Sequence, residues 1–287
     1  MTHAPQTALR NPLLLLLTLF LGLTLTACGE RQQSGFLSGA CEALGITDPP
    51  APRRLVVDAL CDRSSGSPCT QSTLAETCDA ILPALASRPG SQVRLWLQGE
   101  DVSGTGIVSK AIVPEFRSHR LRGRRSEERS WVASSRNLLL GSTRPVWSSK
   151  QPRHSPIAEA LTKIAMTEAP AGSERIVVAL SDGREVSNFG DFECGPLPLK
   201  DVFLTRLAKG CLLTPVSFSN VRVLFAYIGP TPIDDRHCSV TLERTERIKS
   251  LWKEALVRAG ASEVRFLALA PTLEDCDLNR TKGGPTS

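Results

Sequence analysis

Hydrophobic residues are distributed along the chain in two alternating ways, as short continuous runs and as stripes at helical spacing. The runs are rich in Val, Ile and Leu and are typical of strands buried in a sheet. They cover residues 54–61, 92–98, 106–113, 175–180, 221–229 and 264–269. The stripes indicate amphipathic helices. They cover residues 74–86, 155–166, 199–209 and 245–259, with a further candidate at 127–140.

This alternation predicts an α/β fold built on a doubly wound, mostly parallel sheet. The second and third runs are separated by a short stretch from Gly99 to Gly104. A hairpin across that stretch would pair the two strands in opposite directions. We therefore expect one antiparallel edge strand.

The first 27 residues have the pattern of an export signal. Arg10 precedes an apolar run from Leu13 to Leu23, which is shorter than the ~20 residues of a membrane-spanning helix. The sequence Leu25-Thr26-Ala27-Cys28 resembles the lipobox of bacterial lipoproteins, which implies cleavage before Cys28 and acylation of that cysteine. We expect a lipid-anchored protein of the bacterial cell envelope, and Gly29 after the cysteine favours the outer membrane, facing the periplasm.

Composition divides the remaining chain into three parts. Residues 28–52 carry the acylated cysteine and are polar and turn-rich, with Pro49, Pro50 and Pro52 near the end, as expected of a tether. Residues 53–270 contain all the predicted strands and helices, and residues 271–287 form a polar tail. The hydrophobic share of 41% and the charged share of 22% are ordinary for a globular protein.

Eight cysteines remain when Cys28 is set aside from the nine. An even number in an exported protein predicts disulfides, and neighbours in sequence are the preferred partners, although sequence does not fix the pairing. A zinc site is not favoured, because no two cysteines have Cys-x-x-Cys spacing. The candidate disulfide cysteines are Cys41, Cys61, Cys69, Cys78, Cys194, Cys211, Cys238 and Cys276.

Acids and hydroxyls follow two of the predicted strands and begin one helix. Asp62 and Ser64 follow the first strand, Asp182 follows the strand at 175–180, and Ser155 opens a helix. Ligands bind beyond the carboxyl ends of strands in open α/β sheets. Carboxylates and alcohols are hard oxygen ligands that suit magnesium. The same residue types also make turns and helix caps without any metal.

The ordered set resembles the von Willebrand factor type A family, whose adhesion site combines Asp-x-Ser-x-Ser, a loop Thr and a later Ser/Thr-Asp-Gly. The resemblance implies a Mg²⁺ or Mn²⁺ ion held by Asp62, Ser64, Ser155 and Asp182, with one coordination position free for an acidic side chain of a partner protein. It also implies the strand order 3-2-1-4-5-6. The chain departs from the motif at Gly66, which replaces the second Ser, so that ligand is lost or Ser65 or Ser67 takes its place.

The net charge of +5 has one concentration, six arginines between Arg117 and Arg129. No aromatic residues are interleaved among them for base stacking, so nucleic acid is not expected as a partner. The simplest interpretation of these arginines is a solvated loop. If they have a function, binding to an anionic surface is the one we favour.

Two functions remain, and neither is enzymatic, because no Gly-x-Ser-x-Gly elbow or pairing of nucleophile with base can be named. The first is a membrane-anchored module that mediates protein–protein interaction through a Mg²⁺ or Mn²⁺ adhesion-type site. The second is a structural envelope lipoprotein that binds partners through its loops with a decayed metal site, which Gly66 favours.

Overall fold

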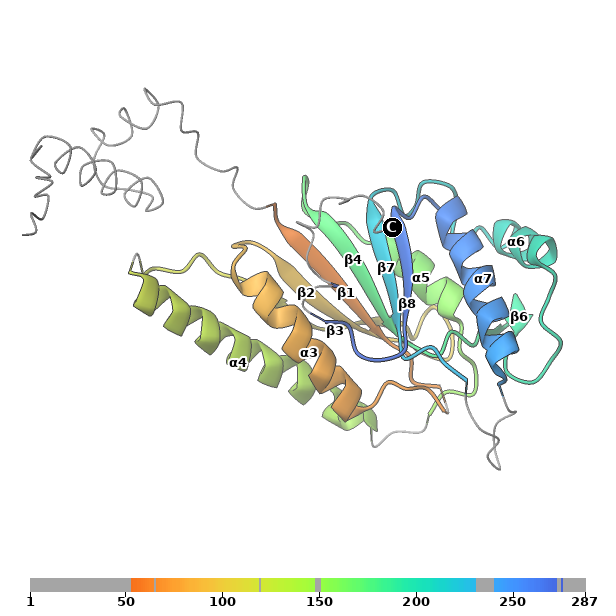
Figure 1. Cartoon of the computed structure of the whole chain (residues 1–287), viewed down its shortest axis with the longest axis horizontal. Helices are drawn as coiled ribbons and strands as arrows, with labels where there is room; N and C mark the ends of the chain where they lie inside the picture. Colours follow the sequence, from red (N-terminus) through yellow and green to blue (C-terminus); the bar gives the residue numbers. More distant parts are fainter. Residues whose placement is uncertain are drawn as a thin grey trace, which may run out of the picture. The chain divides into compact units, whose positions relative to one another are not determined.

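The computed structural model describes residues 53–64, 66–118, 120–147, 151–230, 240–272 and 275, and its centre is a six-stranded sheet (Figure 1). The strand order confirms the predicted one, and every neighbouring pair is parallel except β2 and β3. The order is β3 (Gly106–Ile112), β2 (Gln92–Leu97), β1 (Leu55–Cys61), β4 (Glu174–Leu180), β7 (Val221–Ala226) and β8 (Glu263–Leu267).

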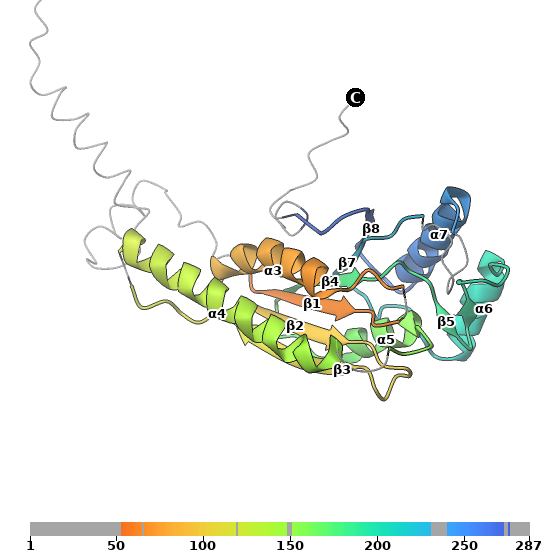
Figure 2. The same ribbon diagram turned by 90° about the horizontal axis from the view of Figure 1, so that it is seen from below.

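Helices cover both faces of the sheet, as the doubly wound prediction requires (Figures 1 and 2). Helices α3 (Gln71–Ala86) and α4 (Leu121–Trp147) enclose one core with the sheet. Helices α5 (Ile157–Met166), α6 (Lys200–Lys209) and α7 (Leu242–Arg258) enclose the other. A two-stranded ribbon of β5 (Val186–Ser187) and β6 (Gly190–Asp191) was not predicted.

The central strands β1 and β4 pair in register along their whole length, from Leu55 opposite Glu174 to Cys61 opposite Leu180. Every residue of β1 is buried, because alternate side chains enter the two cores. Both strands end at the same edge of the sheet. The order changes direction between them, so this edge is the switch point where ligands bind in such folds.

The predicted hairpin between β2 and β3 is confirmed. A Cβ atom on Gly99 would lie 2.5 Å from the backbone carbon of Gly104. The two ends of the turn therefore approach each other more closely than any larger residue at position 99 permits.

The strands also carry buried charges that their apolar patterns did not reveal. Asp58, in the middle of β1, is fully buried and accepts hydrogen bonds from Arg94 Nε at 2.6 Å, Arg175 Nε at 2.8 Å and Trp96 Nε1 at 2.7 Å. The two arginines also donate to carbonyl oxygens at the end of α5 and just beyond it, including Thr167 O and Glu168 O. Cations suit this position because the carboxyl end of a helix carries partial negative charge.

The region between β3 and α5 contains a longer helix than expected. The prediction for residues 127–140 is too short, because α4 runs from Leu121 to Trp147. The arginine-rich stretch that looked like a loop forms its first turns, since arginine is a good helix former when its side chain stays in water. Pro145 is accommodated near the end of the helix.

The structure tests part of the disulfide prediction. Cys61 and Cys69 are bonded, which confirms a pairing between sequence neighbours, and Cys194 is also disulfide-bonded. The prediction is wrong for Cys78 and Cys211, which are free thiols. Cys28, Cys41, Cys238 and Cys276 lie outside the described residues, as do the predicted signal peptide, the predicted tether and most of the predicted tail. Among the described helices, none has both the length and the hydropathy needed to cross a membrane.

Candidate functional site

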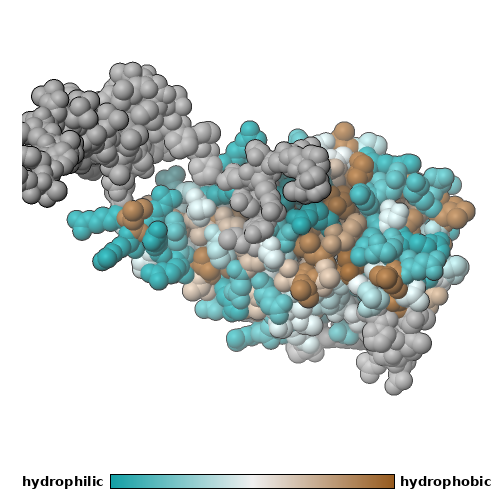
Figure 3. Space-filling model, viewed as in Figure 1, coloured by the Kyte–Doolittle hydropathy of each residue, from teal (hydrophilic) through white to brown (hydrophobic). Residues whose placement is uncertain are grey.

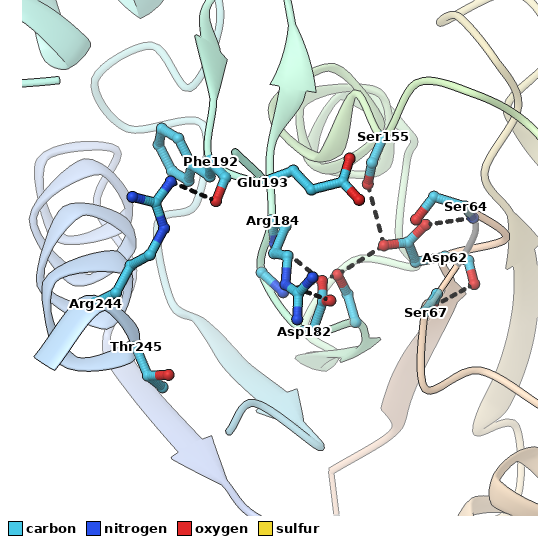
Figure 4. Close-up of polar contacts among 12 residues, drawn as sticks. Asp62, Ser64, Ser67, Ser155, Asp182, Arg184, Phe192, Glu193, Arg244 and Thr245 are labelled. Carbon is cyan, nitrogen blue, oxygen red and sulfur yellow. Dashed lines mark hydrogen bonds and ion pairs between the residues drawn. The ribbon is translucent and has the colours of Figure 1, made fainter. Parts of the chain in front are cut away.

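Asp62 is the centre of a polar cluster at the carboxyl ends of β1 and β4 (Figure 4). Its side chain is fully buried. Its Oδ2 accepts hydrogen bonds from Ser155 Oγ at 3.1 Å and from Ser181 Oγ at 2.9 Å, and its Oδ1 accepts from the Ser64 backbone N–H at 2.9 Å. One carboxylate thus joins three loops whose contacting residues are 93 and 119 positions away in sequence.

The loop after β1 is closed at both ends. The Cys61–Cys69 disulfide spans it, and Ser67 Oγ donates to the backbone carbonyl of Asp62 at 2.7 Å. Ser67 is therefore turned toward the backbone and does not replace the serine that the motif lacks at Gly66. Gly66 has a φ of 80°, which explains why glycine occupies this turn. Ser65 lies outside the described residues.

Ser155 is held in place from several directions. Its backbone N–H and C=O pair with those of Val186, both at 3.0 Å, and Gln98 Nε2 donates to its Oγ at 3.1 Å. Because the Ser155 proton points to Asp62, the Gln98 amide occupies one of the two lone pairs on the serine oxygen. Ser155 lies just before α5, and the α5 amide of Ala158 is capped by Glu185 Oε2 at 2.9 Å.

Asp182 lies at the same edge but is engaged differently. Arg184 Nε is 2.9 Å from Asp182 Oδ2, and both side chains are buried. Gly183, between them, has a φ of 75°, and its carbonyl accepts a 2.7 Å hydrogen bond from Trp252 of α7. This turn directs the Arg184 guanidinium back onto the acid that precedes it.

Burial dominates the electrostatics of the two acids. It raises the pKa of Asp62 above its usual range, and the bonds from serines 64, 181 and 155 partly offset that effect. It raises the pKa of Asp182 to about 6, with Arg184 opposing the rise and the charges of Asp62 and Glu193 adding to it. Figure 4 shows the Glu193 carboxylate directed toward the cluster. The site is therefore acidic, with one internal counter-ion.

Only some of the predicted ligands suit a divalent cation. Among the residues that the structure describes, no three His, Cys, Asp or Glu side chains are grouped so as to hold a metal. Asp182 is paired with Arg184, and a guanidinium at that position repels a second cation. Asp62 and Ser155 do fit, because they are hard oxygen donors and the serine retains a lone pair. Occupancy by Mg²⁺ or Mn²⁺ therefore remains a prediction.

The structure brings Asp62, Ser64 and Ser155 together and places Asp182 at the same edge of the sheet. We call this edge, with the loops that follow β1 and β4 and precede α5, the rim. Sequence reasoning included Ser181 in the Ser-Asp-Gly motif without giving it a role, and it missed Arg184 and Glu185. Ser181 had a readable signal, since it is a hydroxyl residue directly after the apolar run of β4. Arg184 and Glu185 had none, because charges after a strand ordinarily lie in water.

Comparison with known proteins adds little. No family model matches the sequence, and no curated protein matches it. Among solved structures, the chain is similar to the pilus adhesin SpaC from Lactobacillus rhamnosus GG in its open conformation, with a TM-score of 0.39 and 10% sequence identity, over 78% of this chain and 29% of that one. The chain thus spans less than a third of the adhesin's length.

Proposed function

We propose that this protein is an exported, lipid-anchored envelope protein whose α/β domain binds a partner protein at the rim around Asp62. The observation that carries the proposal is the convergence of three loops on one buried carboxylate. A binding surface made of loops loses affinity when the loops must be ordered on association. The Asp62 cluster and the Cys61–Cys69 disulfide remove much of that cost in advance.

The surface that a partner would meet is polar. The cluster itself is buried, but the loops that it joins present Gly66, Arg153 and His154 to solvent and leave Ser64 and Glu193 half-buried. Charges of both signs are therefore within reach of a partner. Such a surface suits a specific complex whose interface has a polar periphery better than a hydrophobic assembly interface.

We place metal-independent binding first because of Arg184. Its guanidinium supplies positive charge at Asp182, which is where the adhesion-site motif would place a cation. The Gly66 substitution and the orientation of Ser67 support the same conclusion, since the second serine ligand of the motif is lost at position 66 and not replaced by Ser67.

Cation-dependent binding is the second candidate, and buried oxygen atoms favour it. Gln98 Oε1 and Glu185 Oε1 accept no hydrogen bond within the part of the chain that the structure describes, and both belong to residues that contact the Ser155 to Ala158 segment. In this version Asp62, Ser64, Ser155 and Asp182 would hold Mg²⁺ or Mn²⁺ after Arg184 moves away. The bound ion would offer its remaining position to an acidic side chain of the partner.

Site-specific photo-crosslinking in intact cells tests the binding surface. A photoreactive amino acid at His154 should give an adduct with a discrete protein, whereas the same residue at Ser87, at the opposite end of the sheet, should not. Asp62→Asn should abolish the adduct in a protein that remains folded by circular dichroism, because the new amide faces two hydroxyl donors. Equal adducts from both positions would reject the rim as the binding surface.

Calorimetric titration of MgCl₂ and MnCl₂ separates the two candidates. Residues 29–287 are suitable for it, because both hydrophobic cores lie within 53–287. Absence of heat supports metal-independent binding. Stoichiometric binding that disappears in Asp182→Ala would establish the cation-dependent candidate instead.

A further inference from the structure

Helix α4 carries a stripe of arginines that the rim does not use. Its members are spaced by three, four and fifteen residues, which places them within about 100° of one another around the helix. They are Arg122, Arg125, Arg129 and Arg144. All four are exposed. We call this set the arginine stripe.

The stripe differs from the other arginines of α4 in lacking acidic partners. Arg124 forms an ion pair with Glu128 at 3.1 Å, and Arg136 forms one with Asp79 of α3 at 2.7 Å. No acid lies within ion-pair distance of the four members among the described residues. Their charges are thus available to an external anion.

A side of α4 next to the arginine stripe is committed to the fold, since Leu139 lies only about 40° from Arg125 around the helix. Leu139 is almost fully buried in the core beneath the helix, and Trp131 Nε1 donates to the β3 carbonyl of Ile112 at 2.9 Å. The orientation of the stripe is therefore fixed relative to the domain. Figures 1 and 2 show the first turns of α4 projecting past α3, and residues 121, 122 and 124–126 are exposed there.

The projecting end is amphipathic in a way that suits a lipid interface. Leu121, the first residue of α4, is 65% exposed beside the first arginines. Figure 3 shows hydrophilic side chains extending from this end of the molecule next to a small hydrophobic patch. Basic residues flanking an exposed apolar side chain are the pattern of segments that lie on anionic membranes.

We propose that the arginine stripe of α4 binds the anionic phospholipid surface of the membrane to which the chain is anchored. Two features favour a membrane as the partner: the positive charge of the stripe and the short stretch of chain between the predicted anchor and the domain. The stretch from residue 29 to 52 has 24 residues and can span at most about 85 Å even when fully extended. The domain would therefore never be far from lipid headgroups, and weak electrostatic contacts become effective under such tethering.

Nucleic acid is the competing polyanion, and the stripe does not favour it. None of the four exposed positions is aromatic, and the nearest tryptophans of α4, Trp131 and Trp147, are half-buried against the domain. Stacking platforms for single strands are thus absent from the stripe among the described residues. A bilayer needs no such platform.

The test is vesicle binding by the unacylated chain, residues 29–287. The vesicles are phosphatidylcholine alone or with 30% phosphatidylglycerol, as a chosen condition of roughly physiological surface charge. Because the acyl chain is absent, the result does not depend on the proposed lipid anchor or on binding at the rim. Binding at the rim is tested separately, by crosslinking at His154 and by the cation titration.

The expected result is sedimentation with anionic but not neutral vesicles, weakened by NaCl. The triple variant Arg122→Gln, Arg125→Gln, Arg129→Gln should lose at least about tenfold in affinity, since three of four unpaired charges are removed. The matched control is Lys209→Gln, Arg247→Gln, Lys253→Gln, which removes the same charge from exposed sites on α6 and α7 and should bind as the parent does.

Three results would overturn the proposal. They are equal losses in the two triple variants, binding to neutral vesicles at the same strength, and tighter binding to a 20-base-pair duplex than to anionic vesicles at the same salt concentration. Circular dichroism shows whether either triple variant has lost its helical structure. Exposed positions on a helix surface make unfolding unexpected, because Gln has a helix propensity close to that of Arg.

Discussion

The Arg184 guanidinium lies 2.9 Å from the Asp182 carboxylate, so the acid that the adhesion-site motif supplies to a metal is held by a cation from its own chain. The two residues are separated only by Gly183, whose φ of 75° allows the chain to turn back on itself. Both side chains are buried, which strengthens their attraction relative to an exposed pair. This ion pair is the feature that distinguishes the rim from an open cation site.

Arg184→Gln should therefore expose a latent affinity for divalent cations. Removing the guanidinium takes away the counter-ion of Asp182, whose pKa the charge of Asp62 already raises, and Mn²⁺ can take that role. We expect Mn²⁺ affinity at least about tenfold above the parent, equivalent to ~1.4 kcal/mol, measured by calorimetry. The double variant Arg184→Gln, Asp182→Asn is the control and should show no gain. An unchanged affinity in the single variant would mean that the oxygen donors are not placed for a metal.

The buried network around Asp58 predicts a large stability effect with no role at the rim. Asp58→Ala leaves Arg94 and Arg175 buried without their shared carboxylate. Breaking a buried pair in this way lowers the free energy of unfolding by about 3–5 kcal/mol. Urea denaturation measures the loss. The matched control is Asp79→Ala, which breaks the exposed pair with Arg136 and should cost less than about 1 kcal/mol. Similar losses in the two variants would contradict this ranking.

The sequence predicts the sheet well because apolar runs such as Arg175 to Leu180 belong to central strands that are buried on both faces, and the strand order followed from the family resemblance. The grouping of Asp62 with Ser155 came from the family resemblance, and the structure shows the two side chains in contact. The sequence does not predict Asp58 or Arg175 as an ion pair. From sequence, a charged residue inside an apolar run is interpreted as facing solvent. Only its neighbours in the folded structure show that it has a partner of opposite charge.

The extent of α4 and the state of Asp182 were beyond the sequence for other reasons. The first turns of α4 lack a hydrophobic stripe, because they project past α3 and their side chains are mostly exposed. Periodicity cannot detect such a helix. The Arg184 side chain reverses onto Asp182 through a backbone turn at Gly183, and side-chain direction after a turn is not encoded in residue spacing.

The two free thiols should differ sharply in reactivity. Burial raises the pKa of Cys78 to about 12, whereas Cys211 is exposed. Only the thiolate reacts with iodoacetamide. Treatment of the native protein should therefore alkylate Cys211 and leave Cys78 unmodified until denaturant is added, as read by peptide mass spectrometry. Modification of both at comparable rates in the native protein would show that α3 opens readily.

Removal of the Cys61–Cys69 disulfide should loosen the rim more than the rest of the domain. The bond closes a loop with a sequence separation of 8, for which chain entropy predicts a loss of about 2–3 kcal/mol. The double variant Cys61→Ser, Cys69→Ser should also show faster amide hydrogen exchange at Ser64, whose N–H bonds to Asp62. Amides of β7 serve as the internal control, and an equal change there would indicate global rather than local loosening.

Glu185 should give the domain a stability that falls as pH rises. Burial raises its pKa from 4.5 to about 8, so between these values the folded state holds a proton that the unfolded state has released. The free energy of unfolding then decreases with pH across this window, with a slope of up to ~1.4 kcal/mol per pH unit from this one group, and levels off above about 8.

Glu185→Gln should flatten that slope, because glutamine stays neutral and its oxygen can still cap α5 by accepting from the Ala158 N–H. Glu168→Gln, at an exposed position just beyond the same helix, should keep the parent slope. Urea denaturation at pH 5, 6.5 and 8 measures both variants. Equal slopes in the parent and in Glu185→Gln would show that Glu185 is already ionised in the folded protein at these pH values.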